Sequence, residues 1–169
     1  GAFISTQSPF QGRIVFPIYD ITGKIVAFNG RILGETLGDV PKYIFHPPKA
    51  KLPLYPTDVT PIKGRVILVE GIYDVINLHD KGLTNALCCF GTHNINEQKL
   101  QLLKMRGVEQ IDIIFDPDTA GQNAVEKVKE LCDKAMIGHH NVKLSGDVKI
   151  DPGALSESAV QGLKEQLYA

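Results

Sequence analysis

Carboxylates in the second half of the chain have the types and spacing that metal-assisted chemistry needs. Glu70 follows the apolar run 65–69, and Asp116 and Asp118 follow a second apolar run, 110–115. Residues two apart in an extended chain point the same way, so both aspartates would face one rim. If the two runs are neighbouring strands, Glu70 joins them, and three carboxylates repel one another unless a hard cation lies between them. This arrangement predicts a cation that assists phosphoryl transfer.

Each of these acids also has a purely structural explanation. Asp118 or Thr119 could cap the helix that follows. Asp74 could favour a helix N-terminus through the helix dipole, and Glu70 could be a solvated loop residue. Because an Asp-x-Asp pair is a weak motif, spacing alone leaves both explanations open.

Alternating strands and helices must position these acids. From residue 65 onward, short apolar runs alternate with helical patterns, which is typical of βαβ units and a parallel sheet. The predicted strands are 65–69, 85–90, 110–115 and 142–144, and the predicted helices are 73–81, 96–105, 120–136 and 155–168. Ligands of such sheets gather at the carboxyl ends of the strands, where Glu70, Asp116 and Asp118 stand.

The first part of the chain has a different pattern. Residues 13–19 and 24–28 are rich in β-formers and flank the turn residues 20–23, which predicts a β-hairpin. Pro17 inside the first strand favours an edge strand or a bulge. Prolines cluster in 34–64, which excludes a long helix or a central strand there and marks a domain boundary.

Length and composition restrict the class of protein. The 169 residues are 43% hydrophobic and 22% charged, which is ordinary for a soluble globular protein and unlike a coiled coil or a collagen-like fibre. The three cysteines form neither a disulfide framework nor a zinc pattern, which favours a reducing, cytoplasmic setting. No apolar run is long enough to cross a membrane.

The charges are distributed unevenly along the chain. Residues 1–64 carry seven Lys/Arg and four Asp/Glu, whereas residues 65–169 carry eleven and fifteen. A basic lobe beside an acidic one suits a metal-dependent enzyme that acts on a polyanion, and chance explains it equally well.

Three motifs taken together resemble one family of domains. They are Val-Glu-Gly-Ile-Tyr-Asp-Val at 69–75, Phe-Gly-Thr at 90–92 and Phe-Asp-Pro-Asp-Thr-Ala-Gly at 115–121. Their order and spacing are similar to those of the TOPRIM domain of DnaG-type primases, topoisomerases, some nucleases and recombination mediators. The segments 11–18, 23–31 and 41–43 resemble the basic N-terminal lobe of a bacterial DnaG-type primase core. The chain is therefore identified as a member of that primase family. Its departures from the family pattern would suit a divergent member, for instance a viral or plasmid primase.

The resemblance implies an α/β fold. A TOPRIM-type, mostly parallel sheet flanked by helices would follow a small basic mixed α/β lobe with a β-hairpin. The implied domains are the basic lobe at 1–64, the TOPRIM domain at 65–154, and a C-terminal helix at 155–169 that begins a further helical region.

The resemblance also implies an activity. A primase catalytic core is a DNA-directed RNA polymerase that makes short RNA primers on single-stranded DNA by metal-dependent nucleotidyl transfer. The implied cofactor is Mg²⁺ or Mn²⁺, with room for two or more ions. The implied partners are single-stranded DNA, ribonucleoside triphosphates and a replicative helicase bound through other domains, with no role for a membrane.

The family motifs assign roles to individual residues of this sequence. Catalytic roles fall to Glu70, Asp74, Asp116 and Asp118. The implied metal ligands are Glu70, Asp116, Asp118 and Asp151, and the implied nucleic-acid and nucleotide contacts are Arg13, Arg31, Lys42 and Tyr43.

The chain departs from the family pattern in three places, one of which is the absence of a recognisable downstream Phe-His-Lys element, for which Lys49 or Lys51 could serve. Gly153 stands where a second acid usually follows the Asp151-Pro152 pair, and Ile44-Phe45-His46 stands where Leu-Asn-Ser is usual.

Two other functions would use the same residues. The chain could be a TOPRIM nuclease or strand-cutting enzyme, or a non-catalytic DNA-binding module whose acids hold a structural cation.

Overall fold

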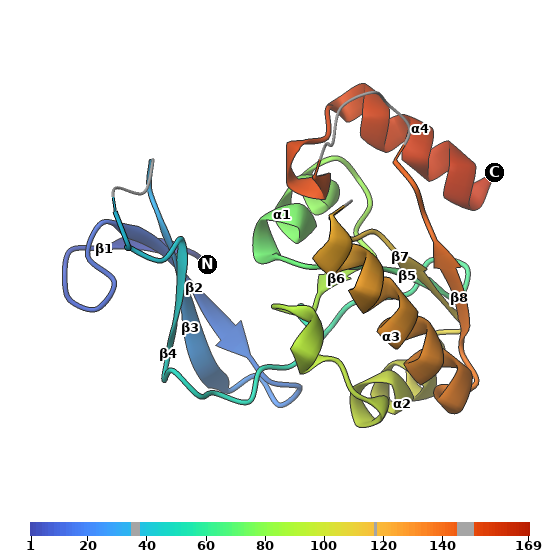
Figure 1. Ribbon diagram of the computed structural model, residues 1–169, viewed down its shortest axis with the longest axis horizontal. Helices are drawn as coiled ribbons and strands as arrows, with labels where there is room; N and C mark the ends of the chain where they lie inside the picture. Colours follow the sequence, from blue (N-terminus) through green and yellow to red (C-terminus); the bar gives the residue numbers. More distant parts are fainter. Residues whose placement is uncertain (35–37, 117, 145–150) are drawn as a thin grey trace. The chain divides into compact units, whose positions relative to one another are not determined.

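A computed structural model of the chain describes residues 1–34, 38–116, 118–144 and 151–169 (Figure 1). The chain divides into two compact units, Gly1–Pro53 and Leu54–Ala169. In this division residues 54–64 belong to the second unit, whereas the sequence pattern assigns them to the basic lobe. The reason is that Leu54 and Val59 are buried in the core of the second unit, where Tyr55 exchanges two backbone hydrogen bonds with Cys88.

The first unit is built on an antiparallel sheet of four strands. They are β1 (Phe3–Ser5), β2 (Arg13–Tyr19), β3 (Ile25–Ile32) and β4 (Tyr43–His46), paired in the order β1-β2-β3-β4. Strands β2 and β3 form the predicted hairpin. Its turn is closed by the Asp20 carboxylate, which accepts hydrogen bonds from the backbone N–H groups of Thr22 and Lys24.

Pro17 lies on an inner strand, so the expectation of an edge strand is wrong for β2. Strand β1 pairs only with Arg13, Ile14 and Val15, and Pro17 lies beyond its end. The expected bulge is present, because the register of β2 against β3 shifts between Ile18 and Tyr19. A proline is tolerated here because no ladder from β1 reaches it.

The second unit contains a parallel sheet of four strands. They are β5 (Arg65–Val69), β6 (Ala86–Cys88), β7 (Gln110–Ile113) and β8 (Gly138–Asn141), in the order β6-β5-β7-β8. The first three confirm the predicted strands. The fourth lies before the expected 142–144, because the long helix ends at Ala135 and Gly138 already pairs with Gln110.

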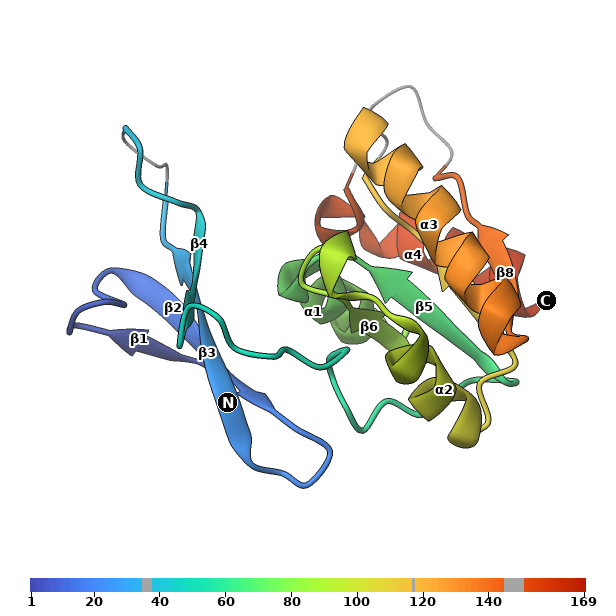
Figure 2. The ribbon, with the colours of Figure 1, turned by 60° about the horizontal axis from the view of Figure 1, so that its bottom comes forward.

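Helices cover both faces of this sheet. They are α1 (Ile72–Asp80), α2 (Glu97–Met105), α3 (Thr119–Ala135) and α4 (Glu157–Tyr168), with short 3-10 turns η1 (Thr92–Asn94) and η2 (Pro152–Ala154). Figure 2 shows α2 and α3 in front of the sheet and α4 behind it. The front layer buries Leu103 and Val128 against Leu68. In the described residues, no helix has both the length and the apolar character of a membrane span.

Helix α4 belongs to the second unit. Its apolar side chains Val160, Leu163 and Leu167 are buried. The Asn77 amide of α1 donates a hydrogen bond to the Leu155 carbonyl just before α4 begins. The predicted C-terminal helix is thus present and packs on the second unit, and the further helical region that it would begin stays a prediction.

The order of the strands creates one switch point in the sheet. The chain passes from β5 to β6 on one side and then crosses to β7 on the other side of β5. Connections leave in opposite directions from the carboxyl ends of β5 and β7, which is where open α/β sheets bind ligands. Glu70 follows β5 and Asp116 follows β7 at this point.

Candidate active site

Glu70 and Asp116 lie together at the switch point. The Glu70 Oε1 atom accepts a hydrogen bond from the Asp116 backbone N–H over 3.1 Å. This contact joins the segments that follow β5 and β7, so the pairing of these two strands brings the two acids to one edge. Pro117, between the two aspartates of the motif, lies outside the described residues.

Asp118 begins helix α3. Its Oδ1 atom accepts a hydrogen bond from the Gly121 N–H over 2.7 Å, so it is the N-cap that its structural explanation predicts. A Cβ atom on Gly121 would lie 2.1 Å from the Asp116 carbonyl oxygen. Only glycine therefore allows the first turn of α3 to pack this closely on the backbone of Asp116.

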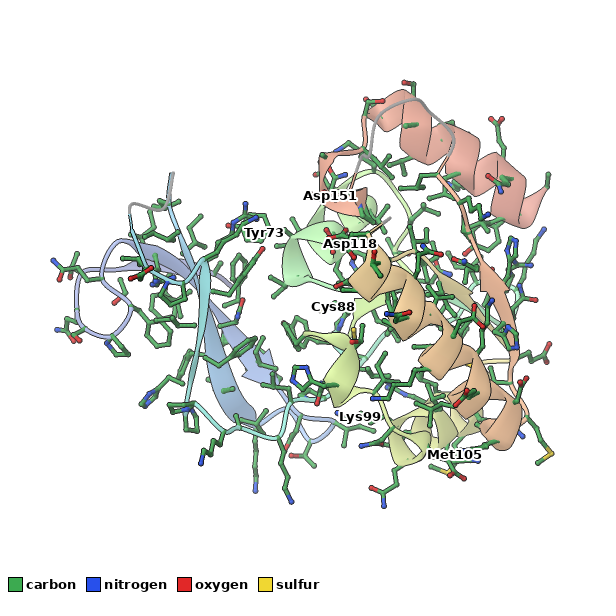
Figure 3. All side chains as sticks on the ribbon, viewed as in Figure 1. Tyr73, Cys88, Lys99, Met105, Asp118 and Asp151 are labelled. Atoms are coloured by element: carbon green, nitrogen blue, oxygen red, sulfur yellow. The ribbon has the colours of Figure 1, made fainter. Side chains whose placement is uncertain are left out.

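Asp74 and Asp151 both lie close to Gly153, which leaves no room for a side chain there. A Cβ atom on Gly153 would lie 2.8 Å from Asp74 Oδ1 and 3.0 Å from Asp151 Oδ1. The other Asp74 oxygen, Oδ2, accepts a hydrogen bond from the Gly71 N–H at the start of α1. Figure 3 shows Asp118 and Asp151 in the region where α3 and η2 begin.

Two acids of this edge, Asp74 and Glu70, have raised pKa values. Burial, followed by the charges of Asp151, Asp116 and Glu70, raises the pKa of Asp74 to about 6, against the lowering effect of the Gly71 N–H. Burial also raises the pKa of Glu70, with smaller contributions from the charges of Asp116 and Asp118. In the described part of the chain, no lysine or arginine forms an ion pair with Glu70, Asp74, Asp118 or Asp151. The edge thus carries negative charge that a cation would stabilise.

The donor chemistry of this edge suits a hard divalent cation. Glu70, Asp74 and Asp118 each accept a hydrogen bond from a backbone N–H with one carboxylate oxygen. The second oxygen of each carboxylate could then bind a cation. Mg²⁺ prefers a few carboxylates together with water and substrate phosphates. Among the residues that the structure describes, no three Asp, Glu, His or Cys side chains converge closely enough to hold one ion. The protein oxygens would therefore supply only part of the coordination shell.

The Phe-Gly-Thr motif forms a fixed loop after β6. Phe90 and Gly91 both have positive φ angles, 53° and 98°. Lys99 donates a hydrogen bond to Asn94 Oδ1 over 2.6 Å, and Asn94 Nδ2 donates to the Cys89 carbonyl over 2.9 Å. Sequence reasoning missed Lys99, since a lysine in the first turn of a helix is ordinarily solvated.

Three of the four expected nucleic-acid residues lie together on the first unit. Arg31 on β3 pairs in register with Tyr43 on β4, and its guanidinium donates a hydrogen bond to the Tyr43 hydroxyl over 3.2 Å. The Arg31 guanidinium carbon lies 5.6 Å from the centre of the Tyr43 ring, and Lys42 Nζ lies 5.9 Å from it. Two cations beside one aromatic ring form a surface that suits phosphates and bases.

Arg13, the fourth of these residues, lies elsewhere on the first unit, and its contact with nucleic acid stays a prediction. Arg13 is 5% exposed, and its guanidinium donates hydrogen bonds to the carbonyl groups of Gly30, Pro41 and Lys42. The register pairs Arg13 with Ile32, so it projects from the opposite face to Arg31. The structure gives Arg13 the role of holding β3 to the segment before β4.

Comparisons with known proteins identify the family. The domain described as "DNA primase catalytic core, N-terminal domain" matches residues 4–50, and the domain described as "Toprim-like" matches residues 67–152. The chain belongs to the DnaG-type primase family. The predicted order of a basic primase lobe before a TOPRIM domain is thereby confirmed.

Curated relatives of this primase-family chain are DNA primases. The DNA primase of Deinococcus radiodurans is 37% identical over 127 residues, which is 68% of this chain and 21% of the relative. The DNA primase of Clostridium acetobutylicum is 34% identical over 123 residues, which is 68% of this chain and 20% of the relative. The chain thus spans about a fifth of the length of these relatives.

Solved primase structures share the fold. The zinc-binding and RNA polymerase domains of the Aquifex aeolicus primase match 97% of this chain and 42% of that chain, with a TM-score of 0.76 and 25% identity. A DnaG primase catalytic domain bound to single-stranded DNA matches 98% of this chain and 55% of that chain, with a TM-score of 0.73 and 27% identity. The α/β fold class predicted from the sequence is confirmed, while the roles of individual acids stay predictions.

Proposed function

We propose that this chain is the catalytic core of a primase, which joins ribonucleotides on a single-stranded DNA template. The observation that carries the proposal is the acidic edge at the switch point of the Toprim-like unit, in one chain with a primase N-terminal domain. A similar catalytic domain bound to single-stranded DNA supports this template. The helicase partner stays a prediction.

The acids would hold Mg²⁺ or Mn²⁺, and two or more ions are compatible with their number. Asp116, Asp118, Glu70 and Asp151 are the proposed ligands. The cation would stabilise charge on the triphosphate and favour ionisation of the attacking 3′-hydroxyl. Glu70 orients the backbone of Asp116, and Asp74, whose pKa is raised to about 6, is the acid here best suited to accept a proton near neutral pH.

The cations of the first unit would hold the nucleic acid or nucleotide. Arg31 and Lys42 carry positive charge beside the Tyr43 ring. Contacts to phosphates make binding depend on salt, and stacking on a ring tolerates any base. Template sequence would then be read mainly by pairing with the incoming ribonucleotide.

Primer synthesis by the chain and two matched variants tests this proposal. The reaction contains single-stranded DNA, supercoiled plasmid, labelled ribonucleotides and Mg²⁺ or Mn²⁺. Asp118→Asn keeps a side chain that can cap α3 but removes a charged ligand. We expect it to lower synthesis by at least about 100-fold, since even indirect partners of metal ligands cost 10–100-fold. Asp133→Asn, an exposed acid near the other end of α3, should leave synthesis unchanged.

The same reaction separates the other functions. Short products that require template and Asp118 support a primase. Cut plasmid without new products would favour a nuclease. Binding of DNA with no chemistry in either assay would favour a non-catalytic module.

A further inference from the structure

The first unit contains a buried amide without hydrogen-bond partners. Asn29 on β3 is 1% exposed, and neither its Oδ1 nor its Nδ2 atom has a hydrogen-bond partner among the described residues. Most buried polar groups in folded proteins are paired, because an unpaired one costs free energy. An apolar side chain would avoid this cost. The amide therefore points to a partner outside the chain.

Asn29 shares one face of the sheet with the expected nucleotide contacts. Side chains two apart on a strand project from the same face, so Asn29 lies on the face of Arg31. The register pairs Asn29 with Phe16 on β2 and with Phe45 on β4, and it pairs Arg31 with Tyr43. Phe16, Tyr43 and Phe45 are only half-buried. The amide is thus surrounded by aromatic rings that are partly open to solvent.

This set of groups suits a nucleotide. Aromatic rings stack on bases, arginine binds phosphate, and the side-chain amide of asparagine matches the donor and acceptor edge of adenine. We propose that Asn29 binds the polar edge of a base that stacks on this face while Arg31 binds its phosphate. Rotation of the surrounding side chains, which is common when interfaces form, would admit the base. The assignment rests on the proposed function and adds a base-reading residue to it.

The departure from the primase pattern at residue 45 supports this assignment. Phe45 stands where the pattern has asparagine, and Asn29 is its direct partner across the strands. The Cβ atoms of such partners lie about 4.5–5.5 Å apart, so an amide at either position can reach the same ligand. The chain thus keeps one amide in this part of the face, on β3 instead of β4.

Nucleotide binding by the full chain tests the assignment. Fluorescence anisotropy would compare labelled ATP, CTP, GTP and UTP with labelled single strands of dA, dC and dT, using wild type and Asn29→Leu. We expect wild type to favour adenine, and Asn29→Leu to bind adenine roughly 5- to 100-fold more weakly with other bases little changed. Loss with free ATP identifies the bound nucleotide as a triphosphate, and loss with the dA strand identifies it as template. Gln161→Leu, which removes an exposed amide from α4, should behave as wild type.

Two further measurements keep the outcome clear. The melting temperature of Asn29→Leu should equal or exceed that of wild type, because leucine has no unpaired polar atoms. The double variant Asn29→Gly with Phe45→Asn should recover adenine binding. Equal binding of every nucleotide by wild type and Asn29→Leu would overturn the assignment alone. Absence of nucleotide and DNA binding by wild type would overturn the proposed function as well.

Discussion

At the residue scale, Asp74 couples the stability of the second unit to pH. Burial and the neighbouring acids raise the pKa of its carboxyl from 3.8 to about 6. The folded chain binds this proton more tightly than the unfolded chain does. The contribution of this proton to the free energy of unfolding is therefore fully present below about pH 4, and it is lost as the pH rises through about 6. The charge on Asp74 then lowers stability by about 1–3 kcal/mol at neutral pH.

We expect Asp74→Asn to be more stable than wild type by about 1–3 kcal/mol at pH 7.5 without divalent cations, and equally stable at pH 4. Asparagine keeps an oxygen that can accept the Gly71 N–H. Urea unfolding at the two pH values measures the difference. Asp133→Asn, an exposed acid, serves as the control. An equal gain at both pH values would mean that the charge is not the cause.

Gly121 is the residue on which the position of Asp116 depends. In Gly121→Ala the new Cβ would lie 2.1 Å from the Asp116 carbonyl oxygen. We expect a loss of about 1–3 kcal/mol in thermal unfolding and weaker Mg²⁺ binding by calorimetry, because the segment carrying Asp116 must move. Gly162→Ala in α4 meets nothing within 4 Å and should gain about 0.5–1 kcal/mol. Equal changes in stability for Gly121→Ala and Gly162→Ala would mean that the close contact of Gly121 with the Asp116 backbone does not matter.

At the scale of elements, an ion pair joins Arg65, the first residue of β5, to Asp112 on β7, whose register partner is Ile67 in the middle of β5. Arg65 donates hydrogen bonds to both oxygens of Asp112, over 2.9 and 2.6 Å, and Asp112 is fully buried. The Arg65 guanidinium also lies 6.0 Å from the centre of the Tyr168 ring of α4. The pair thus links the two strands that Glu70 and Asp116 follow.

Removing Arg65 alone should destabilise the chain strongly. Arg65→Met leaves the buried Asp112 charge with only the Gln110 amide and the His140 ring beside it, and we expect a loss of about 3–5 kcal/mol in urea unfolding. The double variant Arg65→Met with Asp112→Val should recover most of this loss. A double variant as unstable as Arg65→Met would show that packing, and not the unpaired charge, sets the cost.

At the scale of the whole molecule, the segment before β5 belongs to the second unit. Leu54 and Val59 are 7% and 6% exposed in its core. We expect a chain of residues 54–169 to melt cooperatively, and a chain of residues 65–169 to be less stable by about 3–6 kcal/mol, because two apolar side chains are lost. Thermal unfolding followed by circular dichroism measures both. Equal melting temperatures would place the boundary at residue 64 after all.

Predictability differed between local and non-local features. Helix α2 spans Glu97–Met105 and agrees with the predicted helix 96–105, because its N-cap, Asn96, is a residue type that caps helices through neighbours in sequence. Asp118 proved to be a cap as well as a candidate ligand, because one carboxylate has two oxygens. The position of β8 was missed, since Gly138–Asn141 is not an apolar run. The burial of the Arg13 side chain was not predicted either, because arginine side chains are usually solvated.

The family, the alternation of strands and helices, and the acids that follow the strands could all be predicted from the sequence. These follow from motifs and from apolar periodicity, which are local properties of a chain. The position of β5 between β6 and β7, which brings Glu70 to Asp116, is visible only in the folded chain. The placement of Asn29 across from Phe45 is visible only there as well. Strand order and register depend on packing between residues far apart in sequence, and no local pattern encodes them.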